Sequence, residues 1–262
     1  AVEIMSRLKP LLSIKNLCSH YIDLFCSFEK YETSTSTNVI NDSKLNNVNN
    51  EIEIYDKEKG KQNIVCVSSI SEIKAEIDKI QRKNNRKFVL YSVNINNYDN
   101  MIDLDILKMS PFIDYVYLTD SINNIDKNKL IEANWNIIVF KNDENYDFFI
   151  LSRVLKICNQ RFFNSYQSSI YIDSNIQVNN DVYPLFENVL NIDCDMALFK
   201  HPQRNTLYEE FERVIVKNVN VLEIKKNKLK EQYLFYKSQN YDNNNVKYTL
   251  TWNNILIRKH ND

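Results

Sequence analysis

Glycine is almost absent from this sequence of 262 residues, because it occurs once, at Gly60. Loops that wrap a phosphate need several glycines, since only glycine lets the backbone approach the ligand closely. The sequence therefore contains no P-loop, no G-x-G-x-x-G turn and no nucleophile elbow. Asparagine occurs 39 times, and we expect it to replace glycine at turns that need a left-handed backbone.

An excess of charge is also missing, since 33 Lys and Arg residues offset 34 Asp and Glu residues to a net charge of −1. Proteins that bind nucleic acid in general carry a basic excess, so we expect no nucleic-acid partner. Hydrophobic residues make up 44% of the chain, which is typical of a globular protein and not of a disordered polyelectrolyte.

Long apolar runs and paired cysteines are lacking as well. No stretch approaches the roughly 18 apolar residues that a membrane-spanning helix needs, so we expect no transmembrane segment. The five cysteines are scattered and form no C-x-x-C pair, which favours free thiols in a reducing compartment. We therefore expect a cytoplasmic protein, free or peripheral to a membrane.

The chain divides near residue 86 into two regions of different character. We expect residues 1–86 to form a helical extension, with an amphipathic helix at 8–32 and an Asn/Ser/Thr-rich linker at 33–63. The linker has no apolar periodicity, so we expect it to be the least ordered internal segment. The sheet is expected to begin at Phe88.

Beyond that boundary, β-forming runs alternate with segments of helical spacing. Strands are expected at 88–93, 115–119, 135–140, 169–172, 196–199 and 248–257. Helices are expected at 70–80, 152–163, 183–190, 207–219 and 221–239. This alternation predicts an α/β fold, a mainly parallel sheet with helices on both faces. Ligands of such sheets bind beyond the carboxyl ends of the strands.

The most informative polar pair, Asp173 and Asn175, directly follows the strand expected at 169–172. Oxygen ligands two residues apart can bind one Mg²⁺ or Mn²⁺ ion together with phosphate oxygens. The pair is a D-x-N variant of the D-x-D metal motif. The same residues could instead close an ordinary turn.

Two earlier strand ends carry further candidates. After the first, Tyr98 could stack on a base and Asp99 could accept a hydrogen bond from a base or ribose, or both could belong to an Asx-rich turn. After the second, Asp120 could bind a ribose hydroxyl or cap the following turn.

The segment after the strand at 196–199 is dense in functional groups. His201 could bind a metal or donate to a phosphate, and Arg204 suits bidentate recognition of phosphate or carboxylate. Glu209 and Glu210 lie at the start of a helix, where carboxylates stabilise the helix dipole without any catalytic role. Neighbours on a helix point in different directions, so at most one of them is expected to face a cleft.

Lys156 and His260 carry little information by themselves. Lys156 lies on the helix before the fourth strand, where an ordinary solvated lysine is the simplest interpretation. His260 follows the last expected strand, and a histidine so close to the end of a chain is usually incidental.

Together these segments resemble the glycosyltransferase-like family that includes the plant turgor-regulation and seed-mucilage proteins, with many bacterial members. Asn97 stands at the usual glycine of the family's G-x-Y-D turn. The matching segments, in the family's order, are Tyr91–Val93 with Asn97–Asn100, Asp114–Asp120, Trp135, Lys156, Tyr171–Asn175, Lys200–Arg204 with Tyr208–Glu210, and Ile255–Asn261.

The resemblance implies a GT-A-like, Rossmann-like domain over residues 87–262 that moves a sugar from a nucleotide-sugar to a glycan or lipid-linked acceptor, in surface polysaccharide assembly. It places Tyr98, Asp99 and Asp120 at the nucleotide, and Lys156 and Arg204 at the sugar and phosphates. It implies a divalent metal, Mn²⁺ or Mg²⁺, bound by Asp173, Asn175 and His260. The catalytic residues it implies are Asp173, His201, Glu209 and Glu210.

Two departures from the family pattern leave alternatives open. A neutral amide at Asn175 binds a divalent ion less well than a carboxylate, and the family pattern continues past Asn261, so we expect a C-terminally truncated domain. A catalytically degenerate module that binds nucleotide or carbohydrate is the alternative. A phosphotransferase with Asp173 as nucleophile ranks last, because Asn175 cannot serve as the acid.

Overall fold

The computed structural model describes residues 64–96, 109–121, 135–141, 146–176, 178–192, 194–217, 223–238 and 250–260. The helix expected at 8–32 and the linker at 33–63 lie outside these residues, as do Tyr98 and Asp99. The described residues form two compact units. Among the described residues, the larger unit holds those from 64 to 197 and from 254 onward, and the smaller holds those of Leu198–Asn253.

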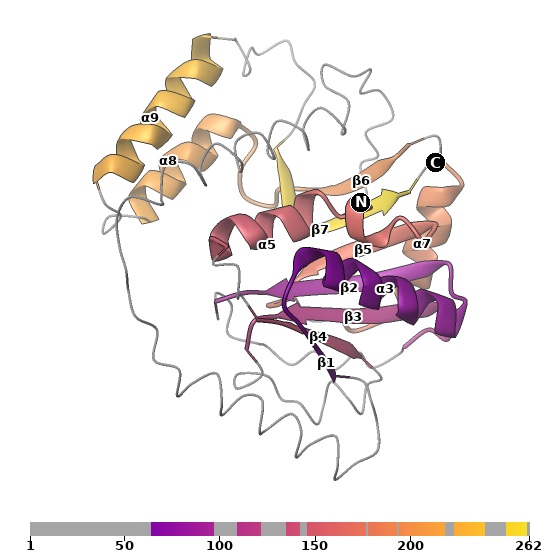
Figure 1. Ribbon diagram of the computed structural model, residues 1–262. Coiled ribbons are helices and arrows are strands. Elements are labelled where there is room, and N and C mark those ends of the chain that lie inside the picture. Colours follow the sequence, from indigo (N-terminus) through magenta and orange to yellow (C-terminus); the bar gives the residue numbers. More distant parts are fainter. Residues whose placement is uncertain are drawn as a thin grey trace. The chain divides into compact units, whose positions relative to one another are not determined.

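Seven strands of the described chain form one sheet, as expected for an α/β fold (Figure 1). The strands are β1 (Ile64–Val67), β2 (Phe88–Asn94), β3 (Ile113–Thr119), β4 (Asn136–Phe140), β5 (Ser168–Asp173), β6 (Met196–Lys200) and β7 (Thr251–Lys259). Their order is β1-β4-β3-β2-β5-β7-β6. The first five pair in parallel, and β7 pairs antiparallel with β5.

The sheet starts earlier than expected. β1 pairs in parallel with β4, with Ile64 beside Ile137, so the expectation that the sheet begins at Phe88 is wrong. The run Ile-Val-Cys-Val at 64–67 is short and directly follows the polar linker, which hid its β character. β-branched residues on a strand that pairs along one edge are enough to extend the sheet.

The first described helix, α3 (Ile70–Asn84), confirms the helix expected at 70–80. It begins because the hydroxyl of Ser69 accepts a hydrogen bond from the backbone N–H of Glu72 at 3.2 Å. It ends at Asn85, whose φ of 52° is left-handed. Asn96 has a φ of 60°, so asparagine does take the place of glycine at both positions.

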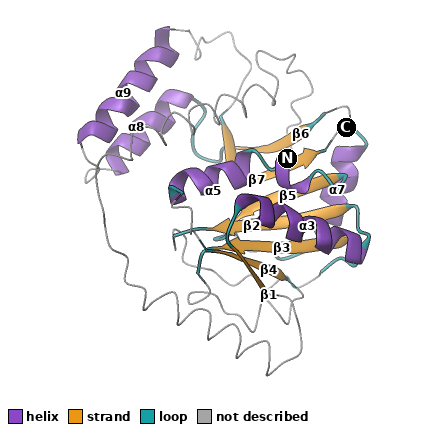
Figure 2. Cartoon of the chain, in the orientation of Figure 1, coloured by secondary structure: helices purple, strands orange, loops and turns teal. Residues whose placement is uncertain are grey.

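Helices cover both faces of the sheet in the larger unit (Figure 2). Phe88 stacks on Phe186 of α7 (Tyr183–Leu190) at 4.8 Å between ring centroids. Tyr91 packs on the opposite face, against Phe163 of α6 (Gln160–Phe163) at 4.3 Å. Residues three apart on a strand point to opposite faces, so the two layers are distinct.

The helix expected at 152–163 is two helices. α5 (Phe148–Ile157) ends at its C-cap Cys158, and α6 follows after Asn159. The smaller unit holds α8 (Leu207–Lys217) and α9 (Glu223–Ser238). Among the helices that the structure describes, none has the length and apolar character needed to cross a bilayer.

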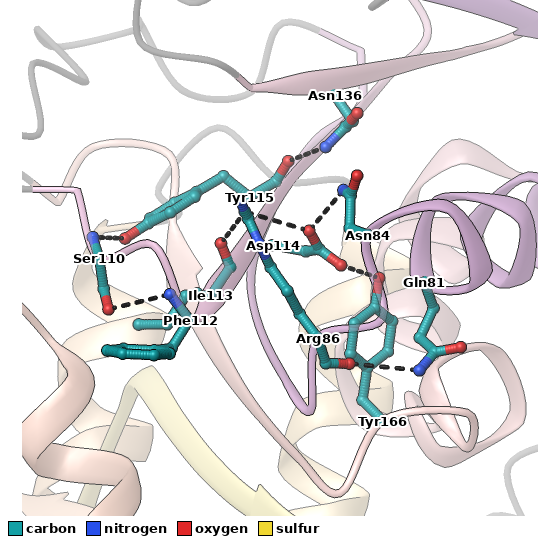
Figure 3. A network of polar contacts seen from close by, with 10 residues as sticks. All are labelled: Gln81, Asn84, Arg86, Ser110, Phe112, Ile113, Asp114, Tyr115, Asn136 and Tyr166. Carbon is teal, nitrogen blue, oxygen red and sulfur yellow. Dashed lines mark hydrogen bonds and ion pairs between the residues drawn. The ribbon is translucent and has the colours of Figure 1, made fainter.

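A buried polar network ties the amino end of β3 to its surroundings (Figure 3). The carboxylate of Asp114, which is fully buried, accepts hydrogen bonds from Asn84 Nδ2 at 2.7 Å and from the Tyr166 hydroxyl at 2.9 Å. Arg86 lies 3.3 Å from the same carboxylate and donates to the carbonyl of Ile113 at 2.6 Å. Asp114 therefore joins α3, β3 and the segment before β5.

Candidate functional site

The carboxyl ends of β2, β3 and β5 meet at one edge of the sheet. Val93 pairs with Asp173 of β5, and Asn94 pairs with Thr119 of β3. Asp120, one residue beyond β3, therefore lies two strands from Asp173. Neighbouring strands are about 4.8 Å apart, so these two acidic residues are separated by about 10 Å across the sheet.

Asp173 lies in a small polar cluster with Lys156 and Tyr171. Its Oδ1 accepts hydrogen bonds from the ammonium group of Lys156 at 2.8 Å and from the hydroxyl of Tyr171 at 2.6 Å. The Lys156 ammonium also lies 4.6 Å from the centre of the Tyr171 ring, an attractive cation–π arrangement. The three side chains form one cluster, which holds a carboxylate and a cation at the carboxyl ends of the strands.

Burial keeps the hydroxyl of Tyr171 protonated and shields the ammonium group of Lys156 from solvent. Burial raises the pKa of the Tyr171 hydroxyl, and the charge of Asp173 raises it further, so the hydroxyl stays protonated and donates. The side chain of Lys156 is only 9% exposed. The simplest sequence interpretation, an ordinary solvated lysine, is therefore wrong, because Lys156 points from the last turn of α5 onto Asp173.

Asn175 lies in the turn that follows β5, and its side chain is exposed. The backbone N–H of Ile176 donates to the carbonyl of Asp173 at 3.0 Å. This segment is thus a closed turn, which was one of the two interpretations of the D-x-N pair. The turn leaves the carboxylate of Asp173 in its cluster with Lys156.

Asp120 holds the loop that follows β2. Both of its carboxylate oxygens accept from the backbone N–H of Asn96 at 3.0 Å. Burial raises the pKa of Asp120, although the hydrogen bond from Asn96 favours its charged form. Asp120 therefore binds the loop that leads toward Tyr98 and Asp99, which themselves lie outside the described residues.

The structure does not bring His260 to Asp173. His260 Nε2 lies 2.9 Å from the hydroxyl of Ser169, and the backbone N–H of His260 donates to the carbonyl of Gln167 at 3.0 Å. Ser169 precedes Asp173 by four residues, which is about 13 Å along a strand. Because β7 is antiparallel to β5, its final residues lie at the amino end of β5, the opposite edge of the sheet.

The expected metal set of Asp173, Asn175 and His260 is therefore not assembled. Burial lowers the pKa of His260 to about 4, so its ring is neutral near pH 7. Within the part of the chain that the structure describes, no group of three or more His, Cys, Asp or Glu side chains could hold a metal ion. Asp173 and Asn175 remain as two oxygen donors beside the turn, a set that fits Mg²⁺ or Mn²⁺ when phosphate oxygens complete the coordination.

In the smaller unit, His201 shapes its own loop. Its Nδ1 accepts hydrogen bonds from the backbone N–H groups of Gln203 at 3.1 Å and Arg204 at 2.9 Å. Nη2 of Arg204 lies 2.6 Å from the other ring nitrogen. The guanidinium of Arg204 also forms an ion pair with Glu210. The structure thus brings His201, Arg204 and Glu210 together in one chain of contacts.

Glu209 has a different role from its neighbour. Its carboxylate accepts from the backbone N–H of Thr206 at 3.3 Å and of Asn205 at 2.7 Å, while the Thr206 hydroxyl accepts from the N–H of Glu209 at 3.2 Å. This reciprocal pair is a capping box at the start of α8. The two adjacent glutamates do point in different directions, and Glu209 stabilises the helix start.

Two polar residues that contact Lys156 or Asp173 had no assigned role in the sequence. Tyr171 lies two residues before Asp173 on the same face of β5, and the period of two in a strand could have indicated the contact. Arg258 follows the apolar run Ile255–Ile257. The residues around it in the sequence do not indicate which groups its buried side chain contacts.

The comparisons with known proteins give one match. The family model of the TOD1/MUCI70 glycosyltransferase-like domain matches residues 40–262. That range begins before the expected boundary at residue 87 and includes β1 and α3. No curated protein and no solved structure matches the chain.

Proposed function

The chain belongs to the TOD1/MUCI70 glycosyltransferase-like family, and on that premise we propose that it transfers a sugar from a nucleotide-sugar to a hydroxyl group of a glycan or lipid-linked acceptor. We further propose that the reaction is a cytoplasmic step of surface polysaccharide assembly, performed free or at the membrane periphery.

The observation that carries the proposal is the cluster of Lys156, Tyr171 and Asp173 at the carboxyl edge of the sheet. Breaking the bond between sugar and diphosphate builds negative charge on the leaving phosphate oxygens. A shielded ammonium group stabilises that charge more strongly than a solvated one, because less water screens it. We assign this role to Lys156.

Asp173 holds Lys156 in place and offers its second carboxylate oxygen to a cation. Because both of the donors described above bind Oδ1, a Mg²⁺ or Mn²⁺ ion would be held by Oδ2 and by the amide oxygen of Asn175. When bound, such an ion would supply neutralisation of the diphosphate. Asp120 would act two strands away, at the nucleoside, beside the backbone of Asn96 that its carboxylate holds.

The roles proposed in the smaller unit rest on the family resemblance alone. Arg204 suits a phosphate or a sugar carboxylate. His201 and Glu210 are the proposed groups to take the proton of the acceptor hydroxyl. Glu209 is assigned to the capping box and not to proton transfer.

A binding module without catalysis is the second candidate, and one observation favours it. The carboxylate of Asp173 is already paired with Lys156 at 2.8 Å, and its partner in the D-x-N pair is a neutral amide. A site that is neutralised in this way has less attraction for a second cation. Nucleotide binding without turnover would then be the whole activity.

The experiment measures release of nucleoside diphosphate from a panel of uridine, guanosine and cytidine diphosphate sugars, with Mn²⁺, with Mg²⁺ and with EDTA. We expect release with one class of donor, and a loss of about 100-fold in Lys156→Met. Lys79→Met is the matched control, because Lys79 is a surface lysine on α3. Binding of a nucleoside diphosphate in calorimetry without release supports the module, and absence of both contradicts both candidates.

A further inference from the structure

The last turn of α5 is held by a side chain from the far end of the chain. The final carbonyl groups of a helix have no partner within the helix and need one from elsewhere. Nη1 of Arg258 on β7 donates to the carbonyls of Lys156 at 3.0 Å and Ile157 at 2.9 Å. A cation at this position also faces the negative end of the helix dipole.

The same guanidinium group binds the residue that separates α5 from α6. Nη1 of Arg258 donates to Oδ1 of Asn159 at 2.6 Å, and Nδ2 of Asn159 donates to the hydroxyl of Ser169 at 2.7 Å. Ser169 belongs to β5, the strand that carries Asp173. The end of α5 is thus tied to that strand through two buried side chains, Arg258 and Asn159.

Lys156 belongs to both networks. Its carbonyl oxygen accepts from Arg258, and its ammonium group donates to Asp173. A lysine side chain is long and flexible, so the position of its ammonium group depends on where its backbone is fixed. The hydroxyl of Tyr91 reaches the carbonyls of Leu155 and Lys156 only at 3.4 Å, which is a weak contact. Of these two side chains, Arg258 therefore makes the closer contacts with the carbonyls of this turn.

We infer that Arg258 is a positioning residue, which fixes the C-terminal turn of α5 and thereby keeps the ammonium group of Lys156 on Asp173. The inference assigns Arg258 no contact with substrate. Its effect on sugar transfer rests on the proposed function, whereas its effect on the Lys156–Asp173 pair does not. All three contacts come from Nη1, which lies one bond further from the backbone than the ammonium nitrogen of a lysine, so a lysine at this position does not reach the same acceptors in the same geometry.

The test is a double-mutant cycle between Arg258→Met and Asp173→Ala, read in thermal midpoint. Arg258 pairs with Ser169 across the sheet, so it lies about 13 Å along the strand from Asp173. Residues that far apart without a shared partner contribute additively to stability. We expect non-additivity instead. The decrease in thermal midpoint caused by Asp173→Ala should be about half as large or less in the Arg258→Met background.

Lys259→Met is the matched control. Lys259 is the next residue of β7, and its ammonium group also donates to a backbone carbonyl, that of Ile192 just after α7, at 2.6 Å. We expect the decrease in thermal midpoint caused by Lys259→Met to add to the decrease caused by Asp173→Ala. Additive losses for Arg258 and Asp173, or equal coupling for Lys259 and Asp173, would overturn the inference.

Arg258→Lys keeps the positive charge and provides a variant that folds if Arg258→Met does not. In this variant we expect the same reduced effect of Asp173→Ala, together with a fall of about tenfold or more in kcat and little change in KM for the donor. An unchanged kcat and an additive cycle would contradict the inference. If the wild-type protein releases no nucleoside diphosphate, the proposed function fails, and the stability cycle alone still decides the role of Arg258.

Discussion

The ammonium group of Lys156 lies 2.8 Å from Oδ1 of Asp173, so the acidic residue of the D-x-N pair already has a cationic partner within the protein. This partner comes from α5, which packs on the face of the sheet that also carries Tyr91 and Tyr171. The charge available at this edge is therefore that of a partly buried ion pair, and both partners should matter for any ligand that carries phosphate.

Asp173→Ala should abolish most of the transfer activity. It removes the formal negative charge of the D-x-N pair and releases Lys156, so we expect turnover to fall by about 10³-fold. Asn175→Ala should cost less, because an amide contributes only a dipole. Turnover and thermal midpoint are measured together, and a variant that melts like the wild type and turns over at the wild-type rate would contradict the assignment.

Asp114→Ala should destabilise the fold without altering the proposed site. Three donors would lose their buried carboxylate, and breaking a buried polar network of this kind costs about 3 kcal/mol of unfolding free energy. Lys79→Ala, on the surface of α3 and 66% exposed, is the control and should cost less than about 0.5 kcal/mol. Chemical denaturation measures both, and equal losses would show that the network contributes little.

Acid should weaken the fold through His260. The pKa of His260 is lowered from 6.5 to about 4 by burial, with a further contribution from Arg258. As pH falls below 6.5, the unfolded chain takes up this proton first, so stability is lost progressively down to about pH 4. The loss amounts to about 3 kcal/mol. Unfolding free energies at several pH values should show a smaller decline in His260→Gln than in the wild type, and parallel curves would refute this.

Glu209→Gln should preserve the start of α8, because glutamine completes a capping box as well as glutamate does. Glu209→Ala should cost about 1 kcal/mol of unfolding free energy, since it leaves backbone donors of the first turn without their acceptor. Comparing the two variants by chemical denaturation separates capping from charge. Equal stability of the alanine and glutamine variants would mean that the box contributes nothing.

The sheet was largely predictable because its strands are short, apolar and separated by helical segments. The run Tyr115–Thr119, for example, has no polar interruption and is buried on both faces, which is typical of a central parallel strand. β1 was missed since four residues carry too little pattern next to a polar linker. The break between α5 and α6 was missed because the contacts of Arg258 and Asn159 at the end of α5 are tertiary, and local spacing does not encode them.

The site was predictable only in part, for a similar reason. The position of Asp173 and Asp120 at strand ends followed from the alternation of strands and helices. Whether Lys156 is solvated or paired depends on the packing of α5 against β5, which no local pattern reports. His260 was misplaced relative to Asp173 because the direction of β7 in the sheet, antiparallel to β5, cannot be read from its own residues.

The strand order has a consequence for synthesis of the protein on the ribosome. β7 lies between β5 and β6 in the sheet, although it is made long after both. Until residues 251–259 have emerged, β5 presents an unpaired edge, which is a template for pairing with other chains. At bacterial or eukaryotic elongation rates this interval lasts on the order of ten seconds. The strand that carries Arg258 therefore also covers the edge of β5 that the nascent chain exposes until then.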